Sequence, residues 1–139
     1  MAVHALALLA QSEEGYPSEL IAGSVNTHAV FLRRVLRRLA QAGIIEAREG
    51  RGGGYRLARA AGRINLAEVY RAMESEGPLS PSPAEPNGRC PVGAGMRDAF
   101  ASTMEAAREA VEEALSRRTV DDVARVALRR GRTNRSTQI

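Results

Sequence analysis

Residues 27–57, THAVFLRRVLRRLAQAGIIEAREGRGGGYRL, decide the fold of this chain. Apolar residues early in the stretch follow the spacing i, i+3, i+4 and i+7, which places them on one face of a helix. They are Leu32, Val35, Leu36 and Leu39. We predict a helix from Thr27 or His28 to about Ala42, ended by Gly43, because glycine readily adopts the left-handed conformation that follows a helix. The opposite side of this helix is rich in arginine.

A β-hairpin is predicted directly after this helix. Residues 44–47 are β-prone, residues 49–54 are rich in glycine, and residues 55–57 favour a second strand. Upstream, residues 3–9 predict a buried first helix. A short second helix is predicted to start at Pro17 and to turn Leu20, Ile21 and Val25 inward, with residues 23–27 as the tight connection to the third helix. Together these elements predict a winged helix-turn-helix with Arg51 at the tip of the wing.

Further helices are predicted after the wing. Residues 65–74 predict an amphipathic helix, and residues 77–95, which are rich in proline, predict a loop. Residues 96 to about 117 predict a long helix whose apolar stripe exceeds what a small core can cover, so we expect it to pair with the same helix of a second subunit. The stripe consists of Met96, Phe100, Met104, Ala107, Val111 and Leu115. Thr119 and Asp122 predict a capping box that opens a last helix through about Leu128.

The predicted fold class is therefore mainly α with a small β-hairpin. A winged helix-turn-helix DNA-binding domain is expected over residues 1–76, and a mobile sensor loop over residues 77–95. The dimerisation helix and the terminal helix are expected over residues 96–130. Residues 131–139 are predicted to form a disordered tail.

The basic residues are concentrated in one part of the chain, and all 20 of them are arginine. Residues 26–63 hold nine arginines and two glutamates, a net charge of +7, which leaves −3 for the rest of a chain whose total is +4. Such a block is typical of proteins that neutralise nucleic-acid phosphates, and it is equally typical of a solvated basic face. The helix and wing that carry the block favour the interpretation as a DNA-binding surface.

Other function classes lack their sequence features. No apolar run approaches the ~18 residues of a membrane span, so we predict no membrane contact and a cytoplasmic location. The single cysteine, Cys90, excludes an internal disulfide and a metal site built from several thiolates of one chain. His4 and His28 have no paired carboxylate or nucleophile pattern, so no catalytic residues and no enzymatic activity are predicted. The glycine-rich wing lacks the lysine of a nucleotide phosphate loop.

Several runs of this sequence together resemble the Rrf2 family of bacterial winged-helix regulators. They are residues 25–27, 31–36, 39–45, 50–58 and 64–70. The resemblance implies a dimeric, sequence-specific regulator, with residues 90–93 in the family's sensor loop and the long helix as its dimerisation helix. Family members that bind an iron–sulfur cluster carry three closely spaced cysteines in this loop. With Cys90 alone, we predict neither a cluster nor another cofactor.

The third helix supplies the predicted contacts to DNA bases. The first turns of a helix in the major groove reach base edges, and arginines beside it reach phosphates. Thr27, His28 and Val30 are therefore the candidates for base readout, and His28 is equally suited to a helix cap or a surface position. Arg33 and Arg34 can reach either a guanine or the backbone.

The remaining predicted contacts come from later in the helix and from the wing. Arg37 and Arg38 are expected to be phosphate contacts or solvated residues, and Arg51 can enter a narrow minor groove, where the potential is most negative. The full predicted DNA-contacting set is Asn26, Thr27, His28, Val30, Arg33, Arg34, Arg37, Arg38, Arg51, Gly52, Gly53 and Tyr55.

Cys90 is the candidate sensor residue. It lies beside Arg89, in a loop that oxidants can reach and near the start of the long helix, a setting that favours a reactive thiolate. An unreactive thiol is the other interpretation. The predicted function is a dimeric repressor of double-stranded, palindromic operator DNA, whose affinity responds to a redox, electrophile or small-molecule signal. The alternative is an architectural DNA-binding protein without sequence readout, against which the exposed, mixed first turn of the third helix argues.

Overall fold

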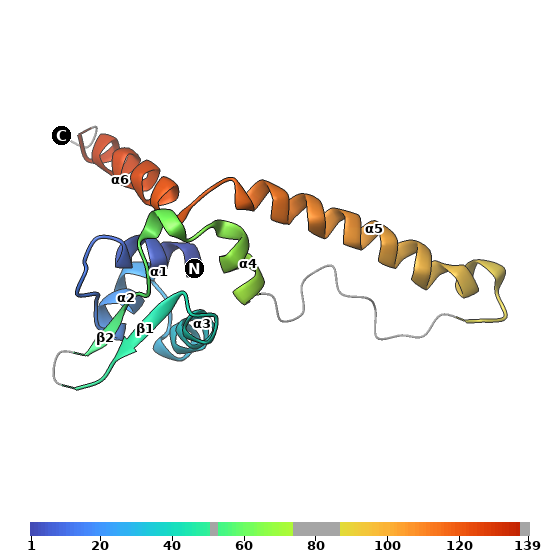
Figure 1. The fold of residues 1–139 in the computed structure, drawn as a ribbon, viewed down its shortest axis with the longest axis horizontal. Coiled ribbons are helices and arrows are strands. Elements are labelled where there is room, and N and C mark those ends of the chain that lie inside the picture. Colours follow the sequence, from blue (N-terminus) through green and yellow to red (C-terminus); the bar gives the residue numbers. More distant parts are fainter. Residues whose placement is uncertain (51–52, 74–86, 137–139) are drawn as a thin grey trace.

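A computed structural model describes residues 1–50, 53–73 and 87–136 (Figure 1). Three short helices come first: α1 (Ala2–Leu9), α2 (Ser18–Val25) and α3 (Ala29–Gln41). The antiparallel hairpin of β1 (Ile45–Arg48) and β2 (Gly54–Leu57) follows, and then the 3-10 helix η1 (Ala61–Arg63) and α4 (Leu66–Met73). The long helix α5 (Pro91–Ser116) extends away from the body, and α6 (Val120–Ser136) follows where α5 returns to it (Figure 1). The predicted fold class is confirmed.

The turn between α2 and α3 is shorter than predicted. Asn26 adopts the left-handed conformation (φ 52°) and ends α2, and the amide of Thr27 donates to the carbonyl of Ala22 at 3.2 Å. Gly23 and Ser24, predicted to belong to the connection, are therefore helical, because asparagine is the residue that accepts the left-handed turn here. The prediction that Leu20 turns inward is also wrong, since this side chain is 46% exposed.

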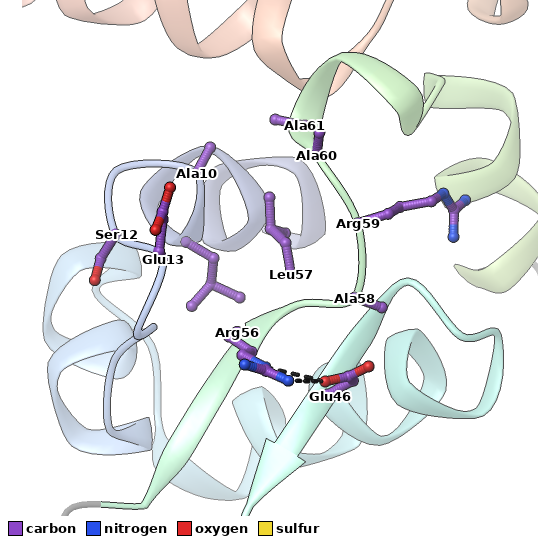
Figure 2. Close-up of a pocket in the computed structure, with 11 residues that line it drawn as sticks. Ala10, Ser12, Glu13, Glu46, Arg56, Leu57, Ala58, Arg59, Ala60 and Ala61 are labelled. Carbon is purple, nitrogen blue, oxygen red and sulfur yellow. Dashed lines mark hydrogen bonds and ion pairs between the residues drawn. The ribbon is translucent and has the colours of Figure 1, made fainter.

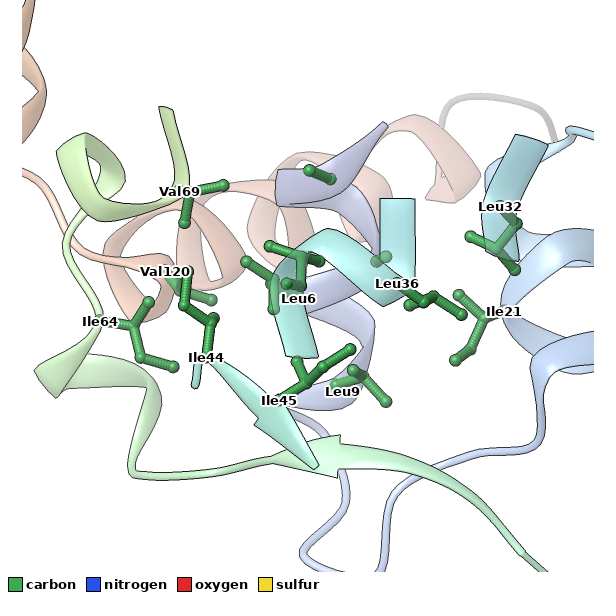
Figure 3. Close-up of a cluster of buried hydrophobic side chains, with 13 residues drawn as sticks. Leu6, Leu9, Ile21, Leu32, Leu36, Ile44, Ile45, Ile64, Val69 and Val120 are labelled. Atoms are coloured by element: carbon green, nitrogen blue, oxygen red, sulfur yellow. The ribbon is translucent and has the colours of Figure 1, made fainter. Parts of the chain in front are cut away.

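The hydrophobic core takes buried side chains from α1, α2, α3, α4 and α6 (Figure 3), whereas α5 contributes none. The predicted inner face of α3 is confirmed: Leu32, Leu36 and Leu39 are buried, and Val35 is half-buried against them. The other large buried side chains are Leu6, Leu9, Ile21, Ile44, Ile45, Ile64, Val69 and Val120. Burial on this inner face fixes which side of α3 points to solvent.

The wing is tied to the segment before α2. In the hairpin Glu46 faces Arg56, and beyond it Tyr16 and Tyr55 exchange two backbone hydrogen bonds of 2.9 Å. Gly15, at φ +82°, allows this approach, because a Cβ atom at Gly15 would lie 2.0 Å from the carbonyl oxygen of Tyr55. The position of the wing relative to α2 thus depends on a residue without a side chain.

Two capping boxes start α4 and α6. The predicted box of α6 is confirmed: the amide of Thr119 donates to Asp122 Oδ2 at 2.9 Å, and the amide of Asp122 donates to Thr119 Oγ1 at 3.2 Å. The pKa of the Asp122 carboxyl is lowered by the bond from the Thr119 amide and then by a bond that the Thr119 hydroxyl donates to the same Oδ2 at 2.9 Å. Asn65 and Glu68 exchange equivalent bonds at the start of α4.

The start of α6 belongs to the core of the winged helix-turn-helix. Val120 and Ala124 are buried, and Asn65 pairs with Thr119 in an antiparallel bridge. The predicted boundaries, with one unit at 1–76 and another at 96–130, therefore need correction, because the core takes side chains from both. The sequence analysis did not predict that the start of α6 packs in the core of the winged helix-turn-helix.

Both C-terminal helices are longer than predicted. α5 begins at Pro91 rather than Met96, since a proline in the first turn needs no amide partner and Cys90 before it is extended. Residues 91–95 are thus helical and not part of the predicted loop, of which residues 77–86 lie outside the described residues. α6 runs past Leu128 to Ser136, into the predicted disordered tail. The four arginines of this extension are good helix formers and are favourable near a helix C-terminus, and they offset the weaker helix propensity of Gly131, Thr133 and Asn134.

Candidate nucleic-acid interface

The solvent face of α3 presents one exposed apolar side chain followed by arginines. Val30, Arg34 and Arg37 follow the spacing i, i+4 and i+7, opposite to the buried leucines. Val30 is 74% exposed, and the two arginines make no hydrogen bond or ion pair with other described residues. This face therefore offers free guanidinium groups beside an apolar contact at the start of the helix.

Arg33 lies on the flank of α3 that faces α2. Its Nε donates to the carbonyl of Ala29 at 3.4 Å, and a small hollow between the helices is lined by both Arg33 and Glu19. The pKa of the Glu19 carboxyl is lowered by its own backbone amide, then by the hydroxyl of Ser18, with the charge of Arg33 adding to the effect. Arg33 thus adds its positive charge near the Glu19 carboxylate at the start of α2, and it also belongs to the basic surface of α3.

Arg38 differs from the three other arginines of the helix. It is half-buried, and its Nη1 donates to the backbone carbonyl of Met73, the last residue of α4, at 3.0 Å. The sequence predicted a phosphate contact or a solvated residue here. The structure gives this guanidinium a partner within the protein, and its contact with DNA stays a prediction.

The residues before α3 line a shallow hollow of about 360 Å³. Asn26 and His28 are exposed and Thr27 is half-buried, and Ala22 and Gly23 complete the lining. His28 is the N-cap residue of α3, and its side chain makes no capping hydrogen bond. The three polar side chains predicted to reach DNA therefore stand together at the start of the helix.

Phe31 was missed as a candidate. It is 60% exposed in the first turn of α3, next to Val30 in sequence. The sequence did contain a signal for its exposure. A phenylalanine that packs in the core would follow the spacing of Leu32, Leu36 and Leu39, and Phe31 does not.

The structure describes only part of the wing. Arg51 and Gly52 lie outside the described residues. Gly53 closes the tip with a 2.9 Å bond from its amide to the carbonyl of Gly50, and a Cβ atom at Gly53 would lie 2.4 Å from the carbonyl oxygen of Arg48. Tyr55 is half-buried and packs against the core, so its role in the fold is to hold the wing in place.

A second hollow, of about 470 Å³, lies between the end of α1 and the exit of the wing (Figure 2). Arg56 and Glu46 point toward one another across the hairpin and form an ion pair of 2.7 Å. Arg59, which also lines this hollow, pairs with Glu68. Both guanidinium groups have carboxylate partners among the described residues, and the other charged residue that lines the hollow is Glu13, so it offers an anionic ligand no unpaired cation.

The predicted sensor residue, Cys90, is exposed at the N-cap position of α5. Its amide donates to the carbonyl of Asn87 at 3.0 Å, and Gly93 lies close under the same carbonyl. The thiol is thus accessible at the start of the long helix.

The predicted dimerisation stripe lies along α5, which extends beyond the body (Figure 1). Phe100 is 46% exposed and Val111 is 37% exposed, and Met96 is similarly open. The remaining three residues of the stripe, Met104, Ala107 and Leu115, are half-buried. Much of the apolar surface of this helix is left uncovered by the part of the chain that the structure describes.

The short turn into α3, its basic outer face and the wing beside it define a winged helix-turn-helix DNA-binding protein. The family model of Rrf2, described as an iron-dependent transcriptional regulator, matches residues 1–126. The chain belongs to the Rrf2 family, as its sequence predicted, and it is a DNA-binding transcriptional regulator.

Named relatives agree with this assignment. The chain is similar to the HTH-type transcriptional regulator YwnA of Bacillus subtilis, with 37% identity over 123 residues that cover 88% of this chain and 91% of YwnA. It is 28% identical to the HTH-type transcriptional repressor NsrR of Streptomyces coelicolor, over 85% of this chain and 77% of NsrR. The solved structure of T. potens IscR matches with a TM-score of 0.63 and 25% identity, covering 91% of this chain and 82% of IscR.

The family description names iron, and the donor set of this chain does not fit a cluster held by several thiolates. The sequence has one cysteine. Among residues 1–50, 53–73 and 87–136, no three His, Cys, Asp or Glu side chains are grouped so that they could hold a metal ion.

In the same ranges, no helix is both long and apolar enough to cross a lipid bilayer.

Proposed function

We propose that this chain is a cytoplasmic, homodimeric repressor that binds a palindromic operator through α3 and the wing and that responds to a signal at Cys90 and α5. The observation that carries the proposal is the solvent face of α3, where exposed Val30 is followed by Arg34 and Arg37, which are exposed and have no partner among the described residues. An α-helix fits the major groove, and its first turns approach the base edges.

The proposed contacts divide into two kinds. Thr27, His28 and Val30 face bases, and Val30 suits the methyl group of a thymine. Arg34 contacts a phosphate or a guanine, Arg37 contacts a phosphate, and Arg51 of the wing enters the minor groove. Asn26, before α3, and Gly52 and Gly53 of the wing complete the proposed contacts. Arg33, beside Glu19, is placed to reach a phosphate on the α2 side.

The test is selection of bound sites from random-sequence duplex DNA by the purified full chain. We expect a palindrome with half-sites about one helical turn apart, bound at least about a thousandfold more tightly than random DNA. Equal affinity for all duplexes would contradict the proposal and leave an architectural DNA-binding protein.

Substitution of Val30 by asparagine should change the preferred base at one or two positions of each half-site. A thymine methyl contact is lost and a hydrogen-bonding group is introduced, with an expected effect of ~1–3 kcal/mol at each position. Repeating the selection with the variant measures this change.

Gln41→Ala serves as the control, because Gln41 is exposed at the far end of α3. It should leave the selected sequence unchanged. Weakening of the Val30 variant by the same factor on every sequence would assign Val30 to the phosphate contacts.

The sensor proposal predicts that hydrogen peroxide weakens operator binding at least about tenfold, a change of 1.4 kcal/mol, and that dithiothreitol restores it. Peroxide converts the exposed Cys90 thiol to a sulfenic acid and is itself reduced to water. The added oxygen at the N-cap of α5 favours a different subunit arrangement, which is required for any effect on DNA. A gel shift of the selected duplex, before and after peroxide and again after dithiothreitol, measures this change in affinity.

Cys90→Ser should bind the operator like the wild type and lose the response. A serine variant that still responds to peroxide would place the sensor elsewhere in the chain. A wild-type chain that ignores peroxide and electrophiles would leave Cys90 as an unreactive thiol.

A further inference from the structure

We propose that Arg38 is a positioning residue, not a DNA contact: with Arg59 it ties the recognition helix α3 to α4 at two points and so sets the spacing of the two recognition helices in the dimer. The inference rests on the proposed function, namely a homodimer that binds a palindrome.

The first tie is the bond from Arg38 Nη1 to the carbonyl of Met73 at 3.0 Å. Arg38 thereby holds the body of α3 to the last described turn of α4. Its side chain is half-buried, whereas Arg34 and Arg37 on the same helix are exposed.

The second tie is made by Arg59, between the wing and η1. Its Nη1 donates to the carbonyl of Gly43, directly after α3, at 3.1 Å, and its Nη2 pairs with the carboxylate of Glu68 in the first turn of α4. One arginine therefore holds the start of α4 to the end of α3, and the other holds the end of α4 to the body of α3. Two separated ties fix an angle between helices, whereas a single tie leaves a pivot.

α4 is in turn joined to the long helix. Arg71 Nη1 and Glu112 Oε2 form an ion pair of 2.6 Å, and the Glu112 side chain is 28% exposed. α4 packs along the part of α5 that is nearest the body (Figure 1). The angle between α3 and the proposed dimerisation helix is thus set through α4.

This angle matters most at the DNA-contacting end of α3. Val30 lies eight residues before Arg38, roughly 12 Å along the helix axis. A rotation of about 10° at the ties would move Val30 by roughly 2 Å, which is comparable to the rise of about 3.4 Å per base pair. Loss of one tie should therefore broaden the range of half-site spacings that the dimer accepts.

The experiment measures affinity for the duplex selected by the wild type and for two versions with one base pair inserted or removed at its centre. The wild type should lose at least about tenfold on either altered duplex, because each change also rotates one half-site by roughly 35°. Arg38→Ala should bind the selected duplex more weakly and lose less than about threefold on the altered ones, with an unchanged dependence on salt.

Arg37→Ala is the matched control, one residue away and exposed. It should keep the spacing preference of the wild type and lower the salt slope by about one, as loss of one phosphate contact does. Arg38→Ala behaving in this same way would overturn the proposal and restore Arg38 to the phosphate contacts.

Glu112→Gln tests the same path from a residue on α5, far from the recognition face, and guards against a folding defect in the Arg38 variant. It should also flatten the spacing preference. If both variants fold, by thermal unfolding, and discriminate spacing as the wild type does, the inference is wrong. If the wild type itself selects no palindrome, the proposed function has failed and not only this inference.

Discussion

Replacing both Phe100 and Val111 with glutamate should leave a monomer and weaken operator binding at least about a thousandfold, to the level of non-specific DNA. Both side chains are exposed on the apolar stripe of α5. In a two-fold dimer each new carboxylate would be buried without a partner, opposite an apolar surface. A monomer contacts a single half-site, so the contribution of the second half-site is lost. Sedimentation equilibrium at micromolar concentration and gel shift of the selected duplex measure the two effects.

Ser102→Glu with Ala106→Glu is the matched control. These residues are exposed on the opposite side of the same helix, so the variant carries the same added charge away from the stripe. It should remain a dimer and bind the operator. A wild type that sediments as a monomer at micromolar concentration would contradict the dimerisation surface itself.

Gly15→Ala should destabilise the chain by about 3 kcal/mol and weaken operator binding with it. A methyl group at this position would meet the carbonyl of Tyr55 at 2.0 Å, and the positive φ adds backbone strain. Relief requires the two-bond bridge between Tyr16 and Tyr55 to open, which frees the wing from α2. Urea unfolding measures the free energy change.

Gly62→Ala is the control, since a Cβ atom at Gly62 meets nothing within 4 Å. Its free energy of unfolding should change by less than about 1 kcal/mol, with the sign set by the unfolded chain. Equal losses in the two variants would show that the bridge to Tyr55 is unimportant for stability.

The features that depend on local spacing were predictable from the sequence. The inner face of α3, the stop at Gly43, the hairpin and the capping box of Thr119 and Asp122 each involve residues a few positions apart. Periodicity and cap chemistry act over this range, so the sequence carries them directly.

The features that depend on distant partners were not predictable in this way. Arg37 and Arg38 are neighbours with the same side chain, yet one is exposed and the other bonds to a backbone carbonyl of α4, 35 positions later in the chain. Leu20 was expected to turn inward together with Ile21 and Val25, but its side chain is exposed, whereas Ile21 is fully buried. The return of α6 to the core through Val120 likewise has no local signature.

That return has a consequence for how the domain is delimited. The amide of Leu66 donates to the carbonyl of Arg118, and the amide of Val120 donates to the carbonyl of Ile64, both at 2.9 Å. The chain thus returns to the winged-helix body beside the point where α4 begins. Helix α4 stays in the core through Val69, and it is α5 that extends beyond the body. A fragment cut off before Thr119 would expose the surface that Val120 and Ala124 cover, so the DNA-binding unit is discontinuous in sequence. Shortening α5 while keeping α4 and the two bonds at Leu66 and Val120, rather than truncating the tail, is the way to isolate that unit.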